Sequence, residues 1–380
     1  MKVCYFGTYR HEYSRNKTMI AALRSAGVEV QVCHVPLWHG IEDRVNTVSG
    51  GWKKPSFFLR VIKVYFQLLW KLIFKVKSFD LMIVGYPGFS DVMVAKPFCM
   101  ILRKKLVWDV LMSVYQVSLE RNLIEGKQSE HHFLRRFEKF SARLANLHIM
   151  DTPEHVDFFS NLYKLPKEKF EVLRLGADDT LFYPRDSVKS HDSFTVLYYG
   201  GYLRNHGIPF IIEAARLLEK SEINFQMIGT GPELEDAKSL SNQYGLRNIH
   251  FLGFLEFESL IQKIAKADIC LGIFGKSIQA EVSINNKIYE CMAMGKVIIT
   301  GDSLATKSLN EKNVLYACSR DDPKHLANAV IKLQSEPELR QKLGMNAKRY
   351  FDTECSTDEL GKQLLNILNK QDWLKEIQNK

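Results

Sequence analysis

Residues 281–300 combine the residue types that a phosphate-binding site requires. Their sequence, E-V-S-I-N-N-K-I-Y-E-C-M-A-M-G-K-V-I-I-T, predicts a helix over about 286–294, then a glycine and a buried strand. Backbone amides at the start of such a helix, together with the cation of Lys287, favour a bound phosphate. Glu290 lies one turn further along on the same face, where its carboxylate can accept hydrogen bonds from ribose hydroxyls. The alternative is a capped helix whose Lys–Glu pair is exposed to solvent.

A second candidate is the loop that follows the first predicted strand of the second half of the chain. It begins with Gly200 and Gly201, which let the backbone approach a ligand closely. Arg204 and His206 follow, and we expect both side chains to face a diphosphate. The turn I-G-T-G-P at 228–232 is a weaker indication, because many strand–helix turns have such a sequence.

The first half of the chain has a comparable loop after its first predicted strand. The strand ends at Gly7, and Thr8, Arg10 and Arg15 follow it. Backbone amides after a strand, with two arginines nearby, can receive an anionic group. An ordinary strand–helix loop is the alternative.

Composition and charge limit the kinds of protein that this chain can be. Its 380 residues are 46% hydrophobic and 25% charged, which is typical of a protein with well-packed cores. The net charge is +9, and all of the excess lies in residues 1–190, which contain 29 basic and 19 acidic residues. A basic first half favours an anionic partner. The seven scattered cysteines form no C-x-x-C pair, so neither a disulfide framework nor a zinc site is predicted. We expect a cytosolic protein without a signal peptide or membrane span.

The densest basic segment, residues 52–77, is also strongly apolar. It has seven basic residues and no acidic one. On a helix, Arg60, Lys63, Lys71 and Lys75 form one polar stripe, and apolar residues fill the rest of the circumference. Such a helix resembles one that lies in a membrane interface and would bind an anionic surface. The alternative is a helix packed on a sheet, with its lysines reaching water. Nucleic-acid binding is not predicted, since no recognition motif accompanies the basic residues.

Short apolar runs alternate with helical stretches along the whole chain. The predicted strands are 3–6, 28–32, 81–84, 106–109 and 147–150, and then 194–199, 225–228, 249–252, 269–273 and 297–300. Two such series predict an α/β protein with two doubly wound parallel sheets, each binding ligands at the carboxyl ends of its strands. The polar stretch 184–193 separates the series. We therefore expect domains at 1–188 and 189–352, followed by a helical segment at 353–380.

Several segments taken together, in order, resemble the retaining glycosyltransferases of family 4, also called group 1. They include G-x-x-x-x-x-H-G before E-A-A (200–215), I-G-T-G-P (228–232), F-L-G-F (251–254), A-K-A-D-I (265–269) and N-K-I-Y-E-C-M-A-M-G-K (286–296). In the first half, L-G-A-D-D-T-L-F-Y-P (175–184) resembles the segment that precedes the family's interdomain linker. The resemblance implies the GT-B fold, in which two Rossmann-like domains face a cleft and a C-terminal helix crosses back to the first domain.

The resemblance also implies roles for the two domains. A nucleotide sugar would bind the second domain, without a metal or other cofactor, and an acceptor would bind the first. From their position at a strand end alone, we assign the acceptor to Gly7, Thr8, Arg10 and Arg15. Lys287 would neutralise the diphosphate, and Glu290 would hold the ribose. The implied donor-binding residues are Gly200, Gly201, Gly229, Gly231, Gly253, Phe254, Glu281, Ser283, Asn285, Asn286, Lys287 and Glu290. The implied catalytic residues are Arg204, His206 and Lys287, and Asp109 is added as a catalytic candidate from its strand-end position alone. Asp109, which ends a predicted strand, would act on the acceptor hydroxyl, and a buried structural aspartate is the alternative.

Two positions depart from the family pattern. The E-x7-E motif requires a glutamate eight residues before Glu290, but Val282 occupies that position and Glu281 lies one place away. Gly201 stands where an arginine is common, so Arg204 would substitute for it.

The sequence therefore predicts a retaining glycosyltransferase. It would use a nucleotide sugar, with UDP favoured, and a glycan or lipid-linked acceptor in surface polysaccharide synthesis. We place it in the cytoplasm, peripheral to the inner face of the membrane. The alternatives are a catalytically silent nucleotide-binding partner and a GT-B sugar-nucleotide epimerase.

Overall fold

The computed structural model of the chain describes residues 1–38, 43, 54–121, 128–185, 193–320 and 322–370. They form two compact units, each built on a six-stranded sheet whose neighbouring strands are all parallel. The two doubly wound sheets confirm the predicted fold class. All ten predicted strands are present, and the structure adds two short edge strands. No helix in the described part of the chain is long and apolar enough to cross a membrane.

The first unit comprises Met1–Arg174 and Thr357–Lys380, and its sheet has the order β2-β1-β3-β4-β5-β6. The strands are β1 Lys2–Gly7, β2 Glu29–His34, β3 Leu81–Val84, β4 Lys105–Asp109, β5 Leu147–Met150 and β6 Phe170–Val172. The helices are α1 Ser14–Ser25, α3 Pro55–Phe74, α4 Phe89–Ile101, α5 Val114–Glu120, α6 Gln128–Leu144, α7 Pro153–Tyr163 and α16 Thr357–Lys370.

Alternate residues of the strands in the first unit belong to two cores on opposite faces of the sheet. Val3 and Tyr5 of β1 pack on the side of α1 and α16, whereas Cys4 and Phe6 pack on the side of α3, α4 and α7. This alternation follows from the two-residue period of a strand. Because both faces are covered by helices, a central strand such as β3 is apolar along its whole length, whereas the edge strand β2 carries Glu29 and Gln31.

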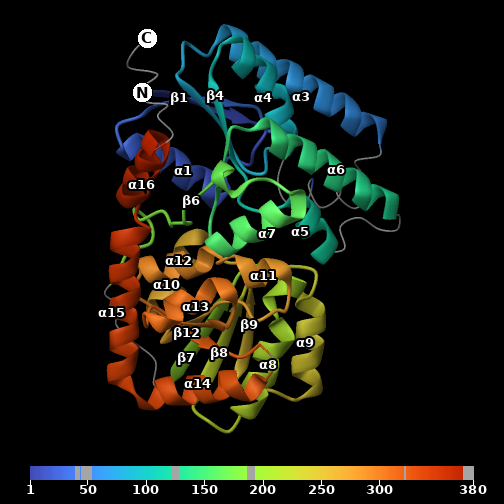
Figure 1. The fold of residues 1–380 in the computed structure, drawn as a ribbon. Helices are drawn as coiled ribbons and strands as arrows, with labels where there is room; N and C mark the ends of the chain where they lie inside the picture. Colours follow the sequence, from blue (N-terminus) through green and yellow to red (C-terminus); the bar gives the residue numbers. More distant parts are fainter. Residues whose placement is uncertain (39–42, 44–53, 122–127, 186–192, 321, 371–380) are drawn as a thin grey trace. The chain divides into compact units, whose positions relative to one another are not determined.

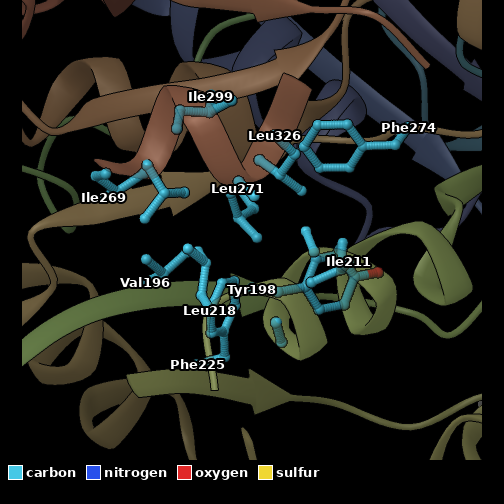
Figure 2. Packing of buried hydrophobic residues seen from close by; sticks show 14 of the residues in the cluster. Val196, Tyr198, Ile211, Leu218, Phe225, Ile269, Leu271, Phe274, Ile299 and Leu326 are labelled. Carbon is cyan, nitrogen blue, oxygen red and sulfur yellow. The ribbon is translucent and has the colours of Figure 1, made fainter. Parts of the chain in front are cut away.

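The second unit comprises Leu175–Ser356, and its sheet has the order β12-β11-β10-β7-β8-β9. The strands are β7 Phe194–Tyr199, β8 Ile223–Ile228, β9 Ile249–Gly253, β10 Ile269–Leu271, β11 Val297–Gly301 and β12 Tyr316–Cys318. The helices are α8 Ile208–Leu217, α9 Leu234–Gln243, α10 Phe257–Lys266, α11 Ile278–Val282, α12 Asn286–Ala293, α13 Leu304–Glu311, α14 Pro323–Ser335 and α15 Pro337–Glu354. Figure 2 shows part of its main core, where Val196 and Leu271 of neighbouring strands lie near Ile211 of α8 and Leu326 of α14.

The boundaries between the two units along the chain differ from the predicted boundaries. The predicted boundary at 188/189 lies outside the described residues, and the segment from Leu175 already belongs to the second unit. Phe182 packs edge-on against Phe257, and Arg185 pairs with Glu258 at 2.6 Å, which holds this segment there. At the other end, α15 continues to Glu354 within the second unit, so the segment that joins the first unit begins at Thr357 rather than at 353.

A glycine allows the last helix of the chain to pack closely on the first. Helices α1 and α16 lie side by side, in blue and red in Figure 1. A Cβ atom at Gly361 of α16 would lie 2.5 Å from the carbonyl oxygen of Ala22 in α1, which is too close for any side chain. The close approach buries Leu360, Leu364 and Ile367 in the core that α1 covers.

We expect Gly361→Ala to destabilise the protein by about 1–3 kcal/mol, because the added methyl group must push the two helices apart. Helix propensity alone would give the opposite sign, since alanine favours a helix more than glycine does. Urea unfolding measures the difference, and Asn366→Ala at an exposed position of the same helix is the matched control. A Gly361→Ala protein at least as stable as wild type would show that the contact is not tight.

Candidate functional site

The strand order of the second unit reverses direction between β7 and β10, which makes the carboxyl ends of these two strands a topological switch point. These strands are neighbours although they are far apart in the chain, so the connections that leave them run to opposite sides. In doubly wound sheets ligands bind at such a switch point. The loop after β7 begins at Gly200, the loop after β10 begins at Gly272, and α12 supplies Lys287 between them.

The ammonium group of Lys287 lies between the two loops. Its Nζ is 3.4 Å from the carbonyl oxygen of Gly272 and 4.0 Å from the centre of the Tyr198 ring. A Cβ atom at Gly200 would lie 3.3 Å from the same Nζ, which is a tight contact, and the φ of 139° at Gly200 also favours glycine. The side chain is 7% exposed, and this burial lowers the pKa of Lys287 to about 7. The site thus holds a cation in a poorly hydrated place, where an anion would be bound strongly.

Glu290 lies one turn further along α12, as predicted, and is oriented by Tyr199 at the end of β7. The Tyr199 hydroxyl donates to Oε2 of Glu290 at 2.9 Å and lies 3.1 Å from the carbonyl oxygen of Lys287. Burial raises the pKa of Glu290, and the Tyr199 hydrogen bond and the Lys287 charge oppose that rise. Sequence reasoning missed Tyr199, because only the fold brings the end of β7 against α12.

Tyr199→Phe should weaken binding of a ribose-containing ligand by about three- to tenfold, because Glu290 loses the hydrogen bond that orients it. The matched control is Tyr202→Phe on the loop after β7, since the buried Tyr202 hydroxyl has no hydrogen-bond partner among the described residues. Dissociation constants from calorimetry measure both effects. Equal constants for wild type and Tyr199→Phe would remove Tyr199 from the site.

The start of α12 leaves polar groups that a ligand can use. Asn285 precedes the helix, and its side chain makes no capping hydrogen bond. The side-chain oxygen of Asn286 is buried without a partner. Ser283 instead donates its hydroxyl to the carbonyl oxygen of Gln279 at 2.9 Å. The assignment of Asn285 and Asn286 to the donor site therefore stays a prediction, whereas the Ser283 hydroxyl is held by α11.

Glu281 has a structural partner that the sequence did not reveal. Its carboxylate forms an ion pair with Arg320 and accepts a hydrogen bond from the amide of Leu304 at 3.0 Å. Arg320 also donates to the carbonyl oxygen of Gly275 at 3.2 Å, and so links Glu281 to the loop after β10. Val282, at the position of the family's first motif glutamate, is buried. Through these contacts Glu281 links the loops around the site, and its carboxylate is not free to bind a ligand.

Two of the expected donor-binding glycines have a packing role instead. Gly229 has a φ of 125°, and a Cβ atom there would lie 2.0 Å from the carbonyl oxygen of Gly200. A Cβ atom at Gly231 would lie 2.5 Å from the amide nitrogen of Tyr202. Both glycines therefore let the turn after β8 pack on the loop after β7. Gly253, in contrast, faces open space at the end of β9, and the adjoining Phe254 is 73% exposed.

His206 and Arg204 lie in the short 3-10 turn Arg204–His206 after β7. His206 is buried, and its Nδ1 is 2.7 Å from the Tyr198 hydroxyl, which itself donates to the carbonyl oxygen of Gly201 at 2.7 Å. Since Tyr198 also lies under Lys287, the structure joins His206 to the Lys287 site through one ring. Arg204 is exposed, and its charge acts on Glu233.

In the first unit, an internal carboxylate occupies the position expected for an anionic ligand. Asp91, at the start of α4, accepts hydrogen bonds from the Thr8 amide at 2.8 Å and from the Tyr65 hydroxyl at 2.7 Å. A Cβ atom at Gly7 would lie 2.5 Å from Asp91. The amide of Thr8 is thus already taken, which corrects the expectation that this loop binds an acceptor through it. Arg10 is half-buried and lies over the Tyr13 ring.

Arg15 and Asp109 bind each other inside the first unit. Nη2 of Arg15 is 2.8 Å from Oδ1 of Asp109, and both side chains are buried. Nη1 of Arg15 donates to the carbonyl oxygens of Leu173 and Arg174 at 3.1 and 2.9 Å. The geometry corrects the expected roles of both residues, because a charge that is paired and enclosed in this way is not presented to a substrate. It favours the structural alternative for Asp109.

Comparisons with known proteins show which families and folds this chain resembles. Residues 179–350 match the sequence model of the family described as glycosyl transferases group 1, and this range covers nearly all of the second unit. The chain is 26% identical over 243 residues to an alpha-D-kanosaminyltransferase of Streptomyces kanamyceticus, covering 60% of this chain and 62% of the relative. It is 23% identical to a lipopolysaccharide core biosynthesis glycosyltransferase of Rhizobium meliloti, covering 58% of this chain and 67% of the relative. These alignments thus span about two thirds of the curated relatives.

Solved structures match over almost the whole chain. A sucrose-phosphate synthase from Thermosynechococcus elongatus superposes with a TM-score of 0.74 at 14% identity, covering 97% of this chain and 98% of the other. HepE of Anabaena in complex with UDP gives a TM-score of 0.72 at 16% identity, covering 97% and 100%. These likenesses show the fold, which is GT-B. The chain is therefore a GT-B protein whose second unit is similar to group 1 glycosyltransferases.

Proposed function

We propose that the protein is a glycosyltransferase that binds a nucleotide sugar in its second unit. The observation that carries this proposal is the placement of Lys287, whose buried ammonium group lies between the loops after β7 and β10 at the start of α12. A cation and helix amides at one point suit a diphosphate. Glu290, held by Tyr199 one turn away, suits the ribose of the same nucleotide.

The same groups support sugar transfer as well as binding. When the bond between the sugar and the diphosphate breaks, negative charge grows on the leaving phosphate. Fixed cations and amides stabilise that charge without reorganising. In many enzymes this stabilisation is the largest contribution to the rate enhancement. We propose that Lys287 and the first amides of α12 act in this way, without a metal ion, and that the product retains the anomeric configuration.

We propose a UDP-sugar as the donor and a glycan or lipid-linked acceptor in surface polysaccharide synthesis, with the acceptor assigned to the first unit. Structures of HepE, which has the same fold, contain UDP and UDP-glucose. Two relatives are described as a lipopolysaccharide core biosynthesis glycosyltransferase and an O-antigen chain mannosyltransferase. Both descriptions concern sugar transfer to surface glycans, which supports the acceptor class.

A thermal-shift panel with UDP, GDP, ADP, CMP and their sugar conjugates tests the proposal. A ligand that binds only the folded state stabilises it by about 2.7 kcal/mol at 100 times its dissociation constant, which is readily measured. We expect UDP and one UDP-sugar to respond, and transfer of that sugar to a glycan acceptor to follow. The absence of any response would contradict the proposed donor site.

A second candidate is a catalytically silent nucleotide-binding partner of another glycosyltransferase. It is favoured by one observation: Val282 replaces the first motif glutamate, and the neighbouring Glu281 is held by Arg320. This candidate predicts binding of a nucleotide without transfer or hydrolysis of any sugar conjugate. Release of UDP from a bound UDP-sugar, with or without acceptor, would exclude it.

A further inference from the structure

Helix α3 of the first unit packs on its sheet by one face only. Val64, Leu68 and Leu72 are buried in the core on that side of the sheet. For this face, the alternative given above, a helix packed on a sheet, is therefore correct. Phe57, Val61 and Tyr65 beside this face are partly buried against the same core, and the opposite side of the helix is exposed.

The opposite face of α3 is apolar and exposed to solvent. Phe66, at its centre, is 71% exposed. The other exposed apolar residues of this helix are Phe58, Leu59, Ile62, Trp70, Ile73 and Phe74. They recur every three or four residues and so form one stripe about 24 Å long. Apolar stripes of this size are rare on isolated soluble proteins and indicate a surface that binds something.

The apolar surface continues onto the end of α4. Met100, Ile101 and Leu102 are exposed there, Ile101 by 78%. Helices α3 and α4 precede the neighbouring strands β3 and β4, so both helices end at the same edge of the sheet. Figure 1 shows the two helices side by side, and Tyr65 of α3 links them by its hydrogen bond to Asp91 of α4.

Basic residues border this apolar surface, and acidic residues are absent from α3 itself. Lys63 is exposed along one side of the stripe, and Lys75 contacts Trp70 with its Nζ 5.4 Å from the ring centre. Lys77 and Arg103 are exposed where the two helices end. The other two residues of the predicted basic stripe are partly engaged: Arg60 pairs with Asp43, and Lys71 donates to the carbonyl oxygen of His34.

We propose that the exposed faces of α3 and the end of α4 bind the surface of an anionic lipid bilayer. Apolar side chains beside a row of lysines match the two layers of a membrane interface, with acyl chains below and phosphate headgroups above. A second copy of the chain is a poorer occupant, because two such surfaces would bring like charges together. The inference does not depend on the proposed function.

The test uses the full chain and vesicles of phosphatidylcholine, either alone or mixed equally with phosphatidylglycerol. At low salt we expect the protein to sediment with the mixed vesicles and much less with phosphatidylcholine alone, because both the apolar and the basic residues contribute. Brominated lipids should quench the fluorescence of Trp70, and this quenching should be lost in Trp70→Phe. Failure to sediment with anionic vesicles at low salt would overturn the proposal.

Two sets of variants separate the apolar from the electrostatic contribution. The double change Ile62→Ser and Phe66→Ser should lower vesicle partitioning by at least about tenfold, whereas Ile331→Ser and Met345→Ser, at exposed apolar positions of the second unit, should not. Reversing Lys63, Lys75 and Lys77 to glutamate should lower it by about a hundredfold. The control reverses Lys220, Lys307 and Lys342, which are exposed in the second unit.

Folding and self-association are checked on the same variants. Unchanged circular dichroism and an unchanged thermal shift with the nucleotide show that each variant is folded, and they report on the donor site separately from the membrane surface. Equal losses of vesicle partitioning in the test variants and in their control variants would overturn the proposal. So would a concentration-dependent dimer that the Ile62→Ser and Phe66→Ser variant abolishes, since the stripe would then be a contact between copies of this chain.

Discussion

Lys287→Met is expected to lower sugar transfer by at least about a hundredfold while making the ligand-free protein more stable. The loss is expected because Lys287 is the only buried lysine or arginine in the described part of the second unit, and the proposed leaving diphosphate would lose its cation. The gain in stability arises because the folded chain must bury an ammonium group, which burial disfavours. Methionine has a similar length, fills the same space and carries no charge, so an increase in the free energy of unfolding of about 1–3 kcal/mol is expected near neutral pH.

The pH dependence of stability has a definite sign. The pKa of Lys287 is lowered to about 7 in the folded protein, whereas in the unfolded chain it keeps the ordinary lysine value. Above about pH 7 the unfolded chain therefore binds a proton that the folded chain lacks, and the contribution of Lys287 to stability rises with pH up to the ordinary lysine pKa. Lys287→Met should lack this rise.

Donor binding should change with pH in the opposite direction. An anionic diphosphate binds the charged form of Lys287, so its affinity should fall above about pH 7, by up to about tenfold for each pH unit. A nucleotide sugar is the suitable ligand, because its esterified phosphates do not titrate in this range. Calorimetry from pH 6 to 9 measures the effect, and urea unfolding measures stability.

Two further variants test whether these results depend on the charge of Lys287, and a third variant tests Glu290. Lys287→Arg keeps the charge at all these pH values, so any donor binding that it retains should be independent of pH. Lys307→Met, at an exposed position, should behave as wild type. Glu290→Ala should also lower turnover by at least about tenfold, by removing the proposed ribose contact. Wild-type rates in both Lys287→Met and Glu290→Ala would contradict the site assignment.

Asp109→Ala is expected to destabilise the protein by about 3–5 kcal/mol, because it leaves the Arg15 guanidinium charged and unpaired in the core of the first unit. The double variant Arg15→Met with Asp109→Leu should recover most of that loss, since it removes both charges and fills their space with apolar groups. Urea unfolding of the single and double variants measures the interaction as a double-mutant cycle.

Glu29→Ala is the matched control for Asp109→Ala. It breaks the Lys2–Glu29 ion pair on the same sheet, whose side chains are about half exposed, and should cost less than about 1 kcal/mol. A different result would support the catalytic role that the sequence suggested for Asp109. That result is an Asp109→Ala protein of wild-type stability that binds the nucleotide normally but transfers no sugar.

The strands were predictable because each buried strand is a short apolar run between polar turns. All ten predicted strands are present, and the helix expected at about 286–294 is α12. The two strands that the sequence did not reveal, β6 and β12, are three residues long and lie at sheet edges. A run of three residues is too short for its pattern of apolar residues to stand out from a loop.

The positions of Lys287 and Glu290 on one helix face were also predictable, because residues three apart on a helix are neighbours whatever surrounds them. Their partners were not. Tyr199 is 91 residues from Glu290 along the chain, and Arg320 is 39 residues from Glu281. Only the order of strands in the second sheet brings these side chains together.

The sequence by itself determined the fold class, the position of the helix that we propose binds phosphate, and the basic, apolar character of residues 52–77, because each depends on residue types at short spacing. The tertiary structure decided which polar residues remain available for chemistry. It paired Arg15 with Asp109, gave the Thr8 amide to Asp91 and bound Glu281 to Arg320, whereas Lys287 forms no ion pair within the described part of the chain. A charge is available to a substrate only if no internal partner satisfies it, and such partners come from distant parts of the chain.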